Sequence, residues 1–375
     1  MIIGYDAKRI VRNATGLGSY GRTLVNDIAR LNPTLRLRLY APDKGRDNLR
    51  EQVISAPGLM FCYPKDCHLP FDKAIWRSRG IVKDLKKDGV QVYHGLSGEL
   101  PIGIRRTGIK SVVTIHDLIF LRHPEFYNWI DTKIYAWKFR QTIREADHII
   151  AVSECTKRDI MEYGHVDEDR ISVIYQSCAP RFNDPSTVNS YESVRLLYGL
   201  PKRFILNVGT IERRKNILLA VKALADLPED LALVIVGRQT SYTNEVLEYI
   251  SSHGLNHRVF LLHGVPDDHL PALYALAEAF VYPSVYEGFG IPVIEAVSCG
   301  LPVVACTGSC LEEAGGPDCL YVAPDDVEAM AAAIRQVLRG AEGREERIRR
   351  SQDYIRRFEG NALAAQVLDL YHSLI

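Results

Sequence analysis

The 375-residue sequence lacks the features of membrane-spanning and exported proteins. No apolar run approaches the roughly 20 residues that a transmembrane helix needs. The first ten residues, MIIGYDAKRI, carry neither the basic start nor the apolar core of a signal peptide. The eight cysteines are scattered, mostly within apolar segments, and none belongs to a Cys-x-x-Cys pair. We therefore expect a cytoplasmic protein with buried free thiols, without disulfides or a zinc site.

Net charge is also lacking, because 46 Lys and Arg residues balance 46 Asp and Glu residues. The balance hides an asymmetry: residues 1–180 hold 28 basic and 21 acidic side chains, and the remainder holds 18 and 25. A basic half is typical of a protein with an anionic partner, although scattered solvated lysines are the commoner explanation of so small an excess. We expect no nucleic acid among the partners.

A chain of this length predicts two domains, since single cores rarely grow beyond about 250–300 residues. Short apolar runs alternate with amphipathic segments, a pattern that predicts two doubly wound α/β domains with parallel sheets. The strands are expected at residues 1–6, 35–42, 90–95, 110–117, 148–153 and 171–177, and then at 203–209, 231–237, 259–264, 279–283, 302–306 and 319–323. We predict an N-terminal domain over 1–185, a second domain over 186–355, and a last helix over 356–375 that packs back on the first domain.

The stretch YEGFGIPVIEAVSCG, residues 286–300, is unusual because it places two glutamates eight positions apart in apolar, glycine-rich sequence. It reads as a strand, a glycine loop and a short helix. Glu287 is expected in the loop, and Glu295 in or just past the first helical turn. A carboxylate near a helix N-terminus interacts favourably with the helix dipole, which explains Glu295 but not Glu287. A ligand with a diphosphate and several hydroxyls explains both, because loop amides bind phosphate and carboxylates accept hydrogen bonds from hydroxyls.

Three other stretches carry chemistry at predicted strand ends. VGTIERRKN groups Arg213, Arg214 and Lys215 after the first strand of the second domain, where cations would neutralise a diphosphate. TIHDL ends a buried strand in His116, although a histidine that merely caps a strand would be the simpler interpretation if this motif stood alone. VYHG ends the preceding strand in His94, which is therefore expected near His116.

The glycines of TGLGSYG, Gly16 and Gly18 among them, formally match a dinucleotide fingerprint. Gly16 lies ten positions after Asp6, the end of the first strand, however, and that fingerprint needs a tight turn. We therefore interpret them as a loop that faces an acceptor and not as an NAD site.

Together EGFGIPVIE, VGTIERRKN and TIHDL resemble the signature motifs of the family 4 retaining glycosyltransferases, which have the GT-B fold. GHVDEDRISVIY and LDLYHSL, near the ends of the two halves, also fit that family. The resemblance covers essentially the whole chain. One departure is Thr210, where many members carry a basic residue after the glycine of the phosphate motif.

The resemblance implies a role for each motif. Lys215 and one of Arg213 or Arg214 would bind the donor diphosphate, Glu295 the ribose and Glu287 the transferred sugar. His116 would sit beside the anomeric carbon, so that His116 and Glu287 form the catalytic pair. The remaining donor contacts would come from Gly288, Phe289 and Gly290 on the phosphate side and from Gly237, Arg238 and Val265 near the base, while Gly16, Gly18 and His94 would lie on the acceptor side.

The expected activity is transfer of a hexose from a nucleotide sugar to a glycan or lipid-linked glycan, with no cofactor and no metal. Bacterial mannosyltransferases of polysaccharide assembly, which use GDP-mannose, are the most similar in these motifs. A nucleotide-sugar epimerase of the same fold and a non-catalytic nucleotide-sugar-binding protein remain alternatives.

Residues 73–89, KAIWRSRGIVKDLKKDG, are the densest basic segment of the first half. With Trp76 among its apolar residues, this segment has the composition of a helix that binds an anionic membrane surface. An ordinary amphipathic helix that packs its apolar side inward is somewhat more expected. In either case the basic half favours peripheral association with the inner membrane face.

Overall fold

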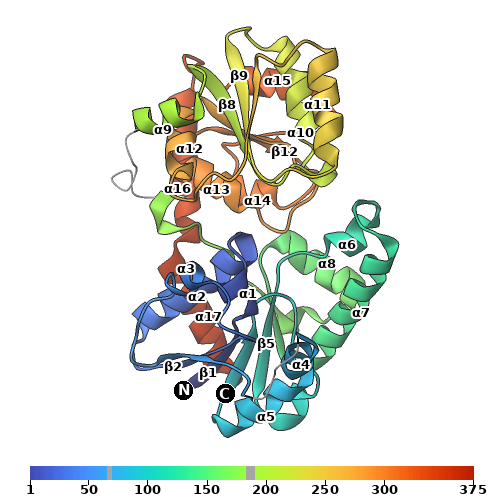
Figure 1. Ribbon diagram of the computed structural model, residues 1–375, viewed down its shortest axis with the longest axis vertical. Coiled ribbons are helices and arrows are strands. Elements are labelled where there is room, and N and C mark those ends of the chain that lie inside the picture. Colours follow the sequence, from blue (N-terminus) through green and yellow to red (C-terminus); the bar gives the residue numbers. More distant parts are fainter. Residues whose placement is uncertain (66–69, 183–190) are drawn as a thin grey trace. The chain divides into compact units, whose positions relative to one another are not determined.

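The computed structural model describes residues 1–65, 70–182 and 191–375, and these form two compact units (Figure 1). The first unit comprises Met1–Ser177 and Phe358–Ile375, and the second comprises Cys178–Arg357. The boundary expected between residues 185 and 186 lies outside the described residues.

The first unit is built on a parallel sheet of seven strands in the order β3-β2-β1-β4-β5-β6-β7. The strands are β1 (Ile2–Asp6), β2 (Arg36–Tyr40), β3 (Leu59–Cys62), β4 (Val92–Gly95), β5 (Lys110–Ile115), β6 (His148–Ala151) and β7 (Ile171–Val173). The chain winds outward from β1 to β3 and then restarts at β4 on the other side of β1. A topological switch point therefore lies between β1 and β4, where doubly wound sheets bind ligands.

Helices cover both faces of this sheet, as the near-continuous apolar strands require. They are α1 (Lys8–Arg12), α2 (Gly16–Leu31), α3 (Asp47–Arg50), α4 (Pro70–Ile75), the π-helix η1 (Trp76–Gly80), α5 (Ile81–Lys87), α6 (Ile119–Arg122), α7 (Trp129–Glu145), α8 (Glu154–Gly164) and α17 (Gly360–Leu374). Successive strand residues point to opposite faces. Val112 packs in the core beneath α1, α2 and α17, and Val113 packs in the core beneath α5, α7 and α8.

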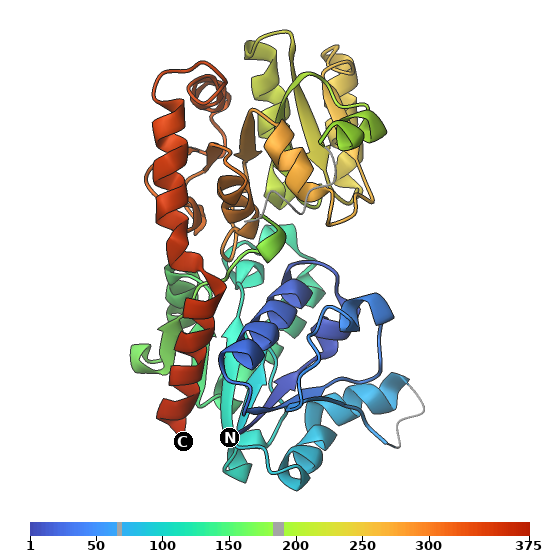
Figure 2. The same cartoon turned by 90° about the vertical axis from the view of Figure 1, so that its left-hand side faces the viewer.

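The last helix, α17, packs along α2 within the first unit (Figures 1 and 2). Leu363, Val367 and Tyr371 of α17 are buried in the same core as Leu24 and Ile28 of α2. The end of the chain thus supplies part of the first unit's hydrophobic core.

The second unit repeats the plan with six parallel strands in the order β10-β9-β8-β11-β12-β13. The strands are β8 (Arg203–Val208), β9 (Leu231–Val236), β10 (Val259–Leu262), β11 (Ala279–Tyr282), β12 (Val303–Cys306) and β13 (Leu320–Val322). The helices are α9 (Tyr191–Tyr198), the 3-10 turn η7 (Arg213–Lys215), α10 (Ile217–Ala223), α11 (Tyr242–Ser252), α12 (Leu270–Leu276), α13 (Ile291–Ser298), α14 (Leu311–Gly315), α15 (Val327–Arg335) and α16 (Arg344–Ile355). Its switch point lies between β8 and β11.

Two doubly wound parallel sheets are what the alternating pattern predicted, and this prediction is confirmed. All twelve expected strands form, but β3 was missed, because it is a short edge strand with only half-buried and exposed side chains. Among the described residues, no helix combines the length and the apolar character needed to cross a membrane.

Candidate active site

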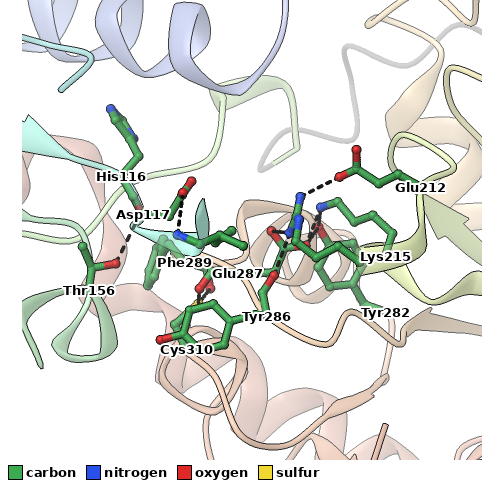
Figure 3. Close-up of polar contacts among 12 residues, drawn as sticks. His116, Asp117, Thr156, Glu212, Lys215, Tyr282, Tyr286, Glu287, Phe289 and Cys310 are labelled. Carbon is green, nitrogen blue, oxygen red and sulfur yellow. Dashed lines mark hydrogen bonds and ion pairs between the residues drawn. The ribbon is translucent and has the colours of Figure 1, made fainter. Parts of the chain in front are cut away.

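Arg214, Lys215 and Glu287 form an ion cluster at the switch point of the second unit. Lys215 and Arg214 follow β8, and Glu287 follows the neighbouring strand β11. Lys215 Nζ lies 2.5 Å from Glu287 Oε1, and Arg214 Nη1 lies 2.8 Å from Glu287 Oε2. The cluster joins residues some 70 positions apart in the chain at the edge where α/β sheets bind ligands (Figure 3).

The cluster keeps its charges although it is buried. Burial alone would raise the pKa of Glu287, but Lys215 and Arg214 outweigh burial and lower that pKa to about 2. Burial likewise would lower the pKa of Lys215, and the carboxylate of Glu287 reverses the effect and raises it. The two cations and the carboxylate are therefore all ionised near neutral pH.

Tyr282, the last residue of β11, completes the cluster and was not predicted from the sequence. Its hydroxyl accepts a hydrogen bond from Lys215 Nζ at 2.5 Å and donates one to Glu287 Oε1 at 3.1 Å. Arg214 is fixed in turn by the Tyr286 carbonyl at 2.6 Å and by Glu212 Oε1 at 2.7 Å. The available signal was position alone, since a tyrosine that ends a buried strand at the switch point faces the ligand edge.

The structure separates the two arginines that the sequence left as alternatives. Arg213 pairs with Glu245 on α11 at 2.5 Å, with its guanidinium over the ring of Tyr242. Its side chain is largely exposed. Arg214, not Arg213, is the arginine of the cluster.

The glycine loop after Glu287 is fixed by hydrogen bonds from a cysteine. The Cys310 thiol donates to the carbonyl oxygens of Glu287 and Phe289 at 3.0 and 2.9 Å. Gly290 has a φ of 115° and is the N-cap residue of α13, a conformation that strongly favours glycine. This loop, Glu287 to Gly290, therefore has a fixed shape at the start of a helix, where backbone amides favour anions.

Glu295 lies one turn into α13 and differs in electrostatic state from Glu287. Its Oε2 accepts a hydrogen bond from the Tyr274 hydroxyl at 3.0 Å. Burial raises the pKa of Glu295 to about 7, and the Tyr274 hydrogen bond offsets only part of that effect. Of the two glutamates eight positions apart, one is thus firmly ionised and the other is poised to take up a proton near neutral pH.

The three residues expected near a nucleotide base follow β9 and β10. A side chain on Gly237 would place its Cβ 1.8 Å from the Gly209 carbonyl oxygen, so the close approach of the β8 loop requires glycine there. Arg238 is exposed and Val265 is half-buried, and both belong to loops at the carboxyl edge of the sheet. They remain candidates for base contacts.

In the first unit His116 directly follows β5, and both of its ring nitrogens are engaged. Nε2 donates to the Leu96 carbonyl at 2.8 Å, and Nδ1 accepts from the Gln176 amide at 2.8 Å. Burial lowers the pKa of His116 to about 4, and the Leu96 hydrogen bond offsets that only in part. The ring lies nearly perpendicular to that of Tyr20, with the ring centroids 4.9 Å apart. His116 is therefore a neutral, oriented ring, and Gln176 is a partner that the sequence did not reveal.

His94 is a core residue, and its predicted place on the acceptor side is wrong. It is fully buried, and its ring nitrogens contact the Tyr371 hydroxyl at 2.6 Å and Thr114 Oγ1 at 2.8 Å. Burial lowers its pKa to about 3. Of the two glycines expected beside it, Gly16 is exposed at the start of α2 and Gly18 is buried two residues later.

Comparison with known proteins decides the family. A sequence profile of Glycosyltransferase Family 4 matches residues 15–177, and one of Glycosyl transferases group 1 matches residues 196–354. The O-antigen chain mannosyltransferase B of Escherichia coli is 30% identical over 287 residues, which are 76% of this chain and 74% of that protein. The chain belongs to the family 4 glycosyltransferases.

Solved structures agree on the GT-B fold. A glycosyltransferase from Rickettsia africae superposes with a TM-score of 0.76 at 19% identity, over 100% of this chain and 98% of that one. The Anabaena protein HepE, solved with UDP and glucose, superposes with a TM-score of 0.74 at 18% identity, over 99% of both chains. The fold that the motifs implied is therefore confirmed, and membership of family 4 confirms the retaining glycosyltransferase activity.

The first unit of this glycosyltransferase also contains a cavity of ≈930 Å³ that the sequence did not indicate. An ion-pair chain crosses its wall: Arg77 Nη2 lies 2.5 Å from Asp6 Oδ2, Arg77 also pairs with Glu99, and Lys138 Nζ lies 3.1 Å from Glu99 Oε1. Trp137 lines the same cavity. Carboxylates in a cavity are groups that accept hydrogen bonds from sugar hydroxyls.

Proposed function

We propose that the enzyme transfers mannose from GDP-mannose to a hydroxyl of a growing polysaccharide, with retention at the anomeric carbon. The observation that carries this proposal is the ion cluster of Arg214, Lys215 and Glu287 at the switch point. The choice of mannose is supported by the 30% identity to an O-antigen mannosyltransferase.

The proposal assigns the diphosphate to Lys215 and Arg214. Both cations are neutralised by carboxylates here, because Glu287 pairs with both and Glu212 pairs with Arg214. A bound diphosphate would compete with Glu287 for the cations and leave its carboxylate to accept hydrogen bonds from the sugar hydroxyls. Departure of the diphosphate is then stabilised by fixed positive charge.

The ribose and base are assigned to the rest of the second unit. Glu295 would accept hydrogen bonds from the ribose hydroxyls, and the amides of Gly288 to Gly290 would bind the phosphate oxygens. The loops that carry Gly237, Arg238 and Val265 would surround the base.

The acceptor proton is assigned to the departing phosphate oxygen, not to His116. The His116 ring is neutral with a pKa of about 4, and its Nδ1 already accepts a hydrogen bond from Gln176, so it is a poor base near pH 7. The C1–O bond to the diphosphate breaks, the acceptor oxygen bonds to C1 on the same face, and the leaving oxygen takes the proton. His116 would act by contact beside C1.

The acceptor is proposed to be a glycan, or a glycan linked to lipid pyrophosphate, at the cytoplasmic leaflet. The cavity with Asp6 and Glu99 supports a sugar acceptor on the first unit, because carboxylates accept hydrogen bonds from hydroxyls. The basic excess of the first half of the chain supports an anionic one.

A thermal-shift panel of GDP, UDP, dTDP and ADP sugars tests the donor, because a ligand that binds the folded state raises its melting temperature. We expect the largest shift with GDP-mannose, and a larger shift with another nucleotide sugar would contradict the choice of donor. Incubation with donor alone separates the classes: a transferase hydrolyses it slowly at most, whereas an epimerase changes the sugar. Anomeric NMR of the product then checks retention.

A further inference from the structure

The largest group of exposed apolar side chains in the first unit lies on α4 and α7. The exposed fractions are 72% for Phe71, 47% for Ile75, 50% for Ile130, 45% for Ile134 and 59% for Trp137. Such gathered exposure is typical of a binding surface, whereas single exposed apolar residues are ordinary. These five residues are called the α4–α7 face below.

The α7 residues of this face form a stripe along one side of the helix. Ile130, Ile134 and Trp137 are spaced four and three positions apart, which places them on successive turns of one side. Phe71, Ile75 and Trp137 line the same ≈930 Å³ cavity, so α4 and α7 border it together. Figure 1 shows both helices in the first unit.

Trp76, which the sequence made the candidate membrane anchor, is not part of this face. It is buried, and its indole Nε1 donates to Asp84 Oδ2 at 2.6 Å. Ile81 and Leu85 are buried beside it in the core. The segment 73–89 therefore packs its apolar side inward, as the ordinary interpretation of that segment held, and the membrane role expected of Trp76 is wrong.

The segments that carry the α4–α7 face are rich in positive charge. Residues 70–87 and α7 together carry ten Lys and Arg against four Asp and Glu. Several of these cations are exposed, including Arg79 on η1, Lys83 on α5, and Lys133 and Arg140 on α7. Such an excess favours an anionic surface, and it disfavours a second copy of this face, because like charges would be opposed.

We propose that the α4–α7 face docks the enzyme on an anionic lipid bilayer, with the apolar side chains in the interfacial layer and the basic side chains on the headgroups. Aromatic and aliphatic side chains that project from a basic helix are the composition of interfacial membrane elements. The cavity would then open beside the bilayer, where a lipid-linked acceptor presents its sugar. This inference deepens the proposed function. Membrane docking itself does not depend on the proposed function, and only the delivery of a lipid-linked acceptor to the cavity rests on it.

Vesicle co-sedimentation tests the proposal with full-length protein. We expect binding to phosphatidylcholine vesicles that contain 30% phosphatidylglycerol, weak binding to phosphatidylcholine alone, and partial release by 0.5 M NaCl. The variant Ile134→Ser/Trp137→Ser should bind the anionic vesicles roughly tenfold or more weakly. Lys133→Gln/Arg140→Gln should lose roughly 10–30-fold on anionic vesicles, with little change on neutral ones.

Leu197→Ser/Leu247→Ser is the matched control, because these side chains of the second unit are 64% and 43% exposed. It should bind vesicles as the wild type does. A nucleotide-sugar thermal shift on every variant shows whether the donor site is intact. Donor binding without vesicle binding overturns the docking proposal alone, and vesicle binding without any donor binding overturns the proposed function alone.

Two further outcomes would overturn the docking proposal. Equal binding of the Ile134→Ser/Trp137→Ser variant and the wild type would remove the face from any membrane role. A wild type that sediments as a dimer in solution, with the variant a monomer, would assign the face to a second copy. Tryptophan fluorescence adds an independent readout, because Trp76 is buried and Trp129 and Trp137 are exposed, so a blue shift on anionic vesicles reports the α7 side.

Discussion

Replacement of Glu295 by glutamine should stabilise the second unit at pH 8 and weaken donor binding there. Burial raises the pKa of this carboxyl from 4.5 to about 7. The folded protein therefore favours the protonated form, while the unfolded chain ionises at its ordinary pKa. The stability that this group contributes is complete below pH 4.5 and is lost as the pH rises through 7.

The size of the effect follows from the two pKa values. A carboxyl whose pKa rises from 4.5 to about 7 lowers the free energy of unfolding at pH 8 by about 3 kcal/mol relative to its protonated form. Glutamine keeps the shape and the acceptor oxygen for the Tyr274 hydroxyl but never ionises. The melting transition of the 180-residue second unit should rise by roughly 6–10 °C at pH 8 and by little at pH 5.

Scanning calorimetry of wild type and Glu295→Gln at pH 5 and pH 8 measures this difference, and the other titrating groups cancel between the two proteins. Glu248→Gln, an exposed change on α11, is the matched control and should shift neither transition. Titration of donor at pH 8 should show about fivefold weaker binding to Glu295→Gln, because a charge-assisted hydrogen bond becomes a neutral one. Equal melting differences at both pH values would refute the electrostatic reasoning.

Three further predictions concern the catalytic machinery. Lys215→Ala should weaken donor binding roughly 10–150-fold by calorimetry. Arg213→Ala, two positions away and paired with Glu245, should change donor binding less than about threefold, and equal losses would return Arg213 to the site. His116→Ala should lower kcat while donor affinity stays nearly constant, and a variant with wild-type kcat would leave that ring a structural role only. Turnover should persist in EDTA, since fixed cations can stabilise the leaving diphosphate, and complete loss that manganese restores would show that a metal is required.

Local pattern was enough to predict the sheets and the position of the donor site. Buried parallel strands are continuous apolar runs, and they are visible one at a time in the sequence. Lys215 and Glu287 each follow such a run, and parallel strands end at the same edge, so both had to reach the ligand-binding edge. Their pairing needed only that β8 and β11 be neighbours, which doubly wound topology provides.

Local pattern could not choose between side chains whose partners are distant in sequence. Arg213 and Arg214 are adjacent in a basic cluster, and only the positions of Glu245 and Glu287 decide which one faces the donor site. His94 ends a strand as His116 does, yet Tyr371, 277 residues later, closes over it. Trp76 was interpreted as a membrane anchor because of the basic residues beside it in sequence. In the structure its indole N–H instead donates a hydrogen bond to Asp84 on the next helix.

The two glutamates show why the spacing of the motif is informative without being sufficient. Eight positions place one carboxylate in the loop and the other one turn into the helix, and both reach the same ligand edge. Their opposite electrostatic states come from elsewhere: Lys215 and Arg214 keep Glu287 ionised, whereas Glu295 is half-buried beside the Tyr274 hydroxyl. An ionised Glu287 needs a cationic or hydroxylated partner at all times, and the donor supplies the hydroxyls when its diphosphate draws the cations away. Glu295 can be protonated in the free enzyme and ionise when the ribose binds, so donor binding should release a proton near pH 7. Calorimetry in buffers of different ionisation enthalpy measures the number of protons released.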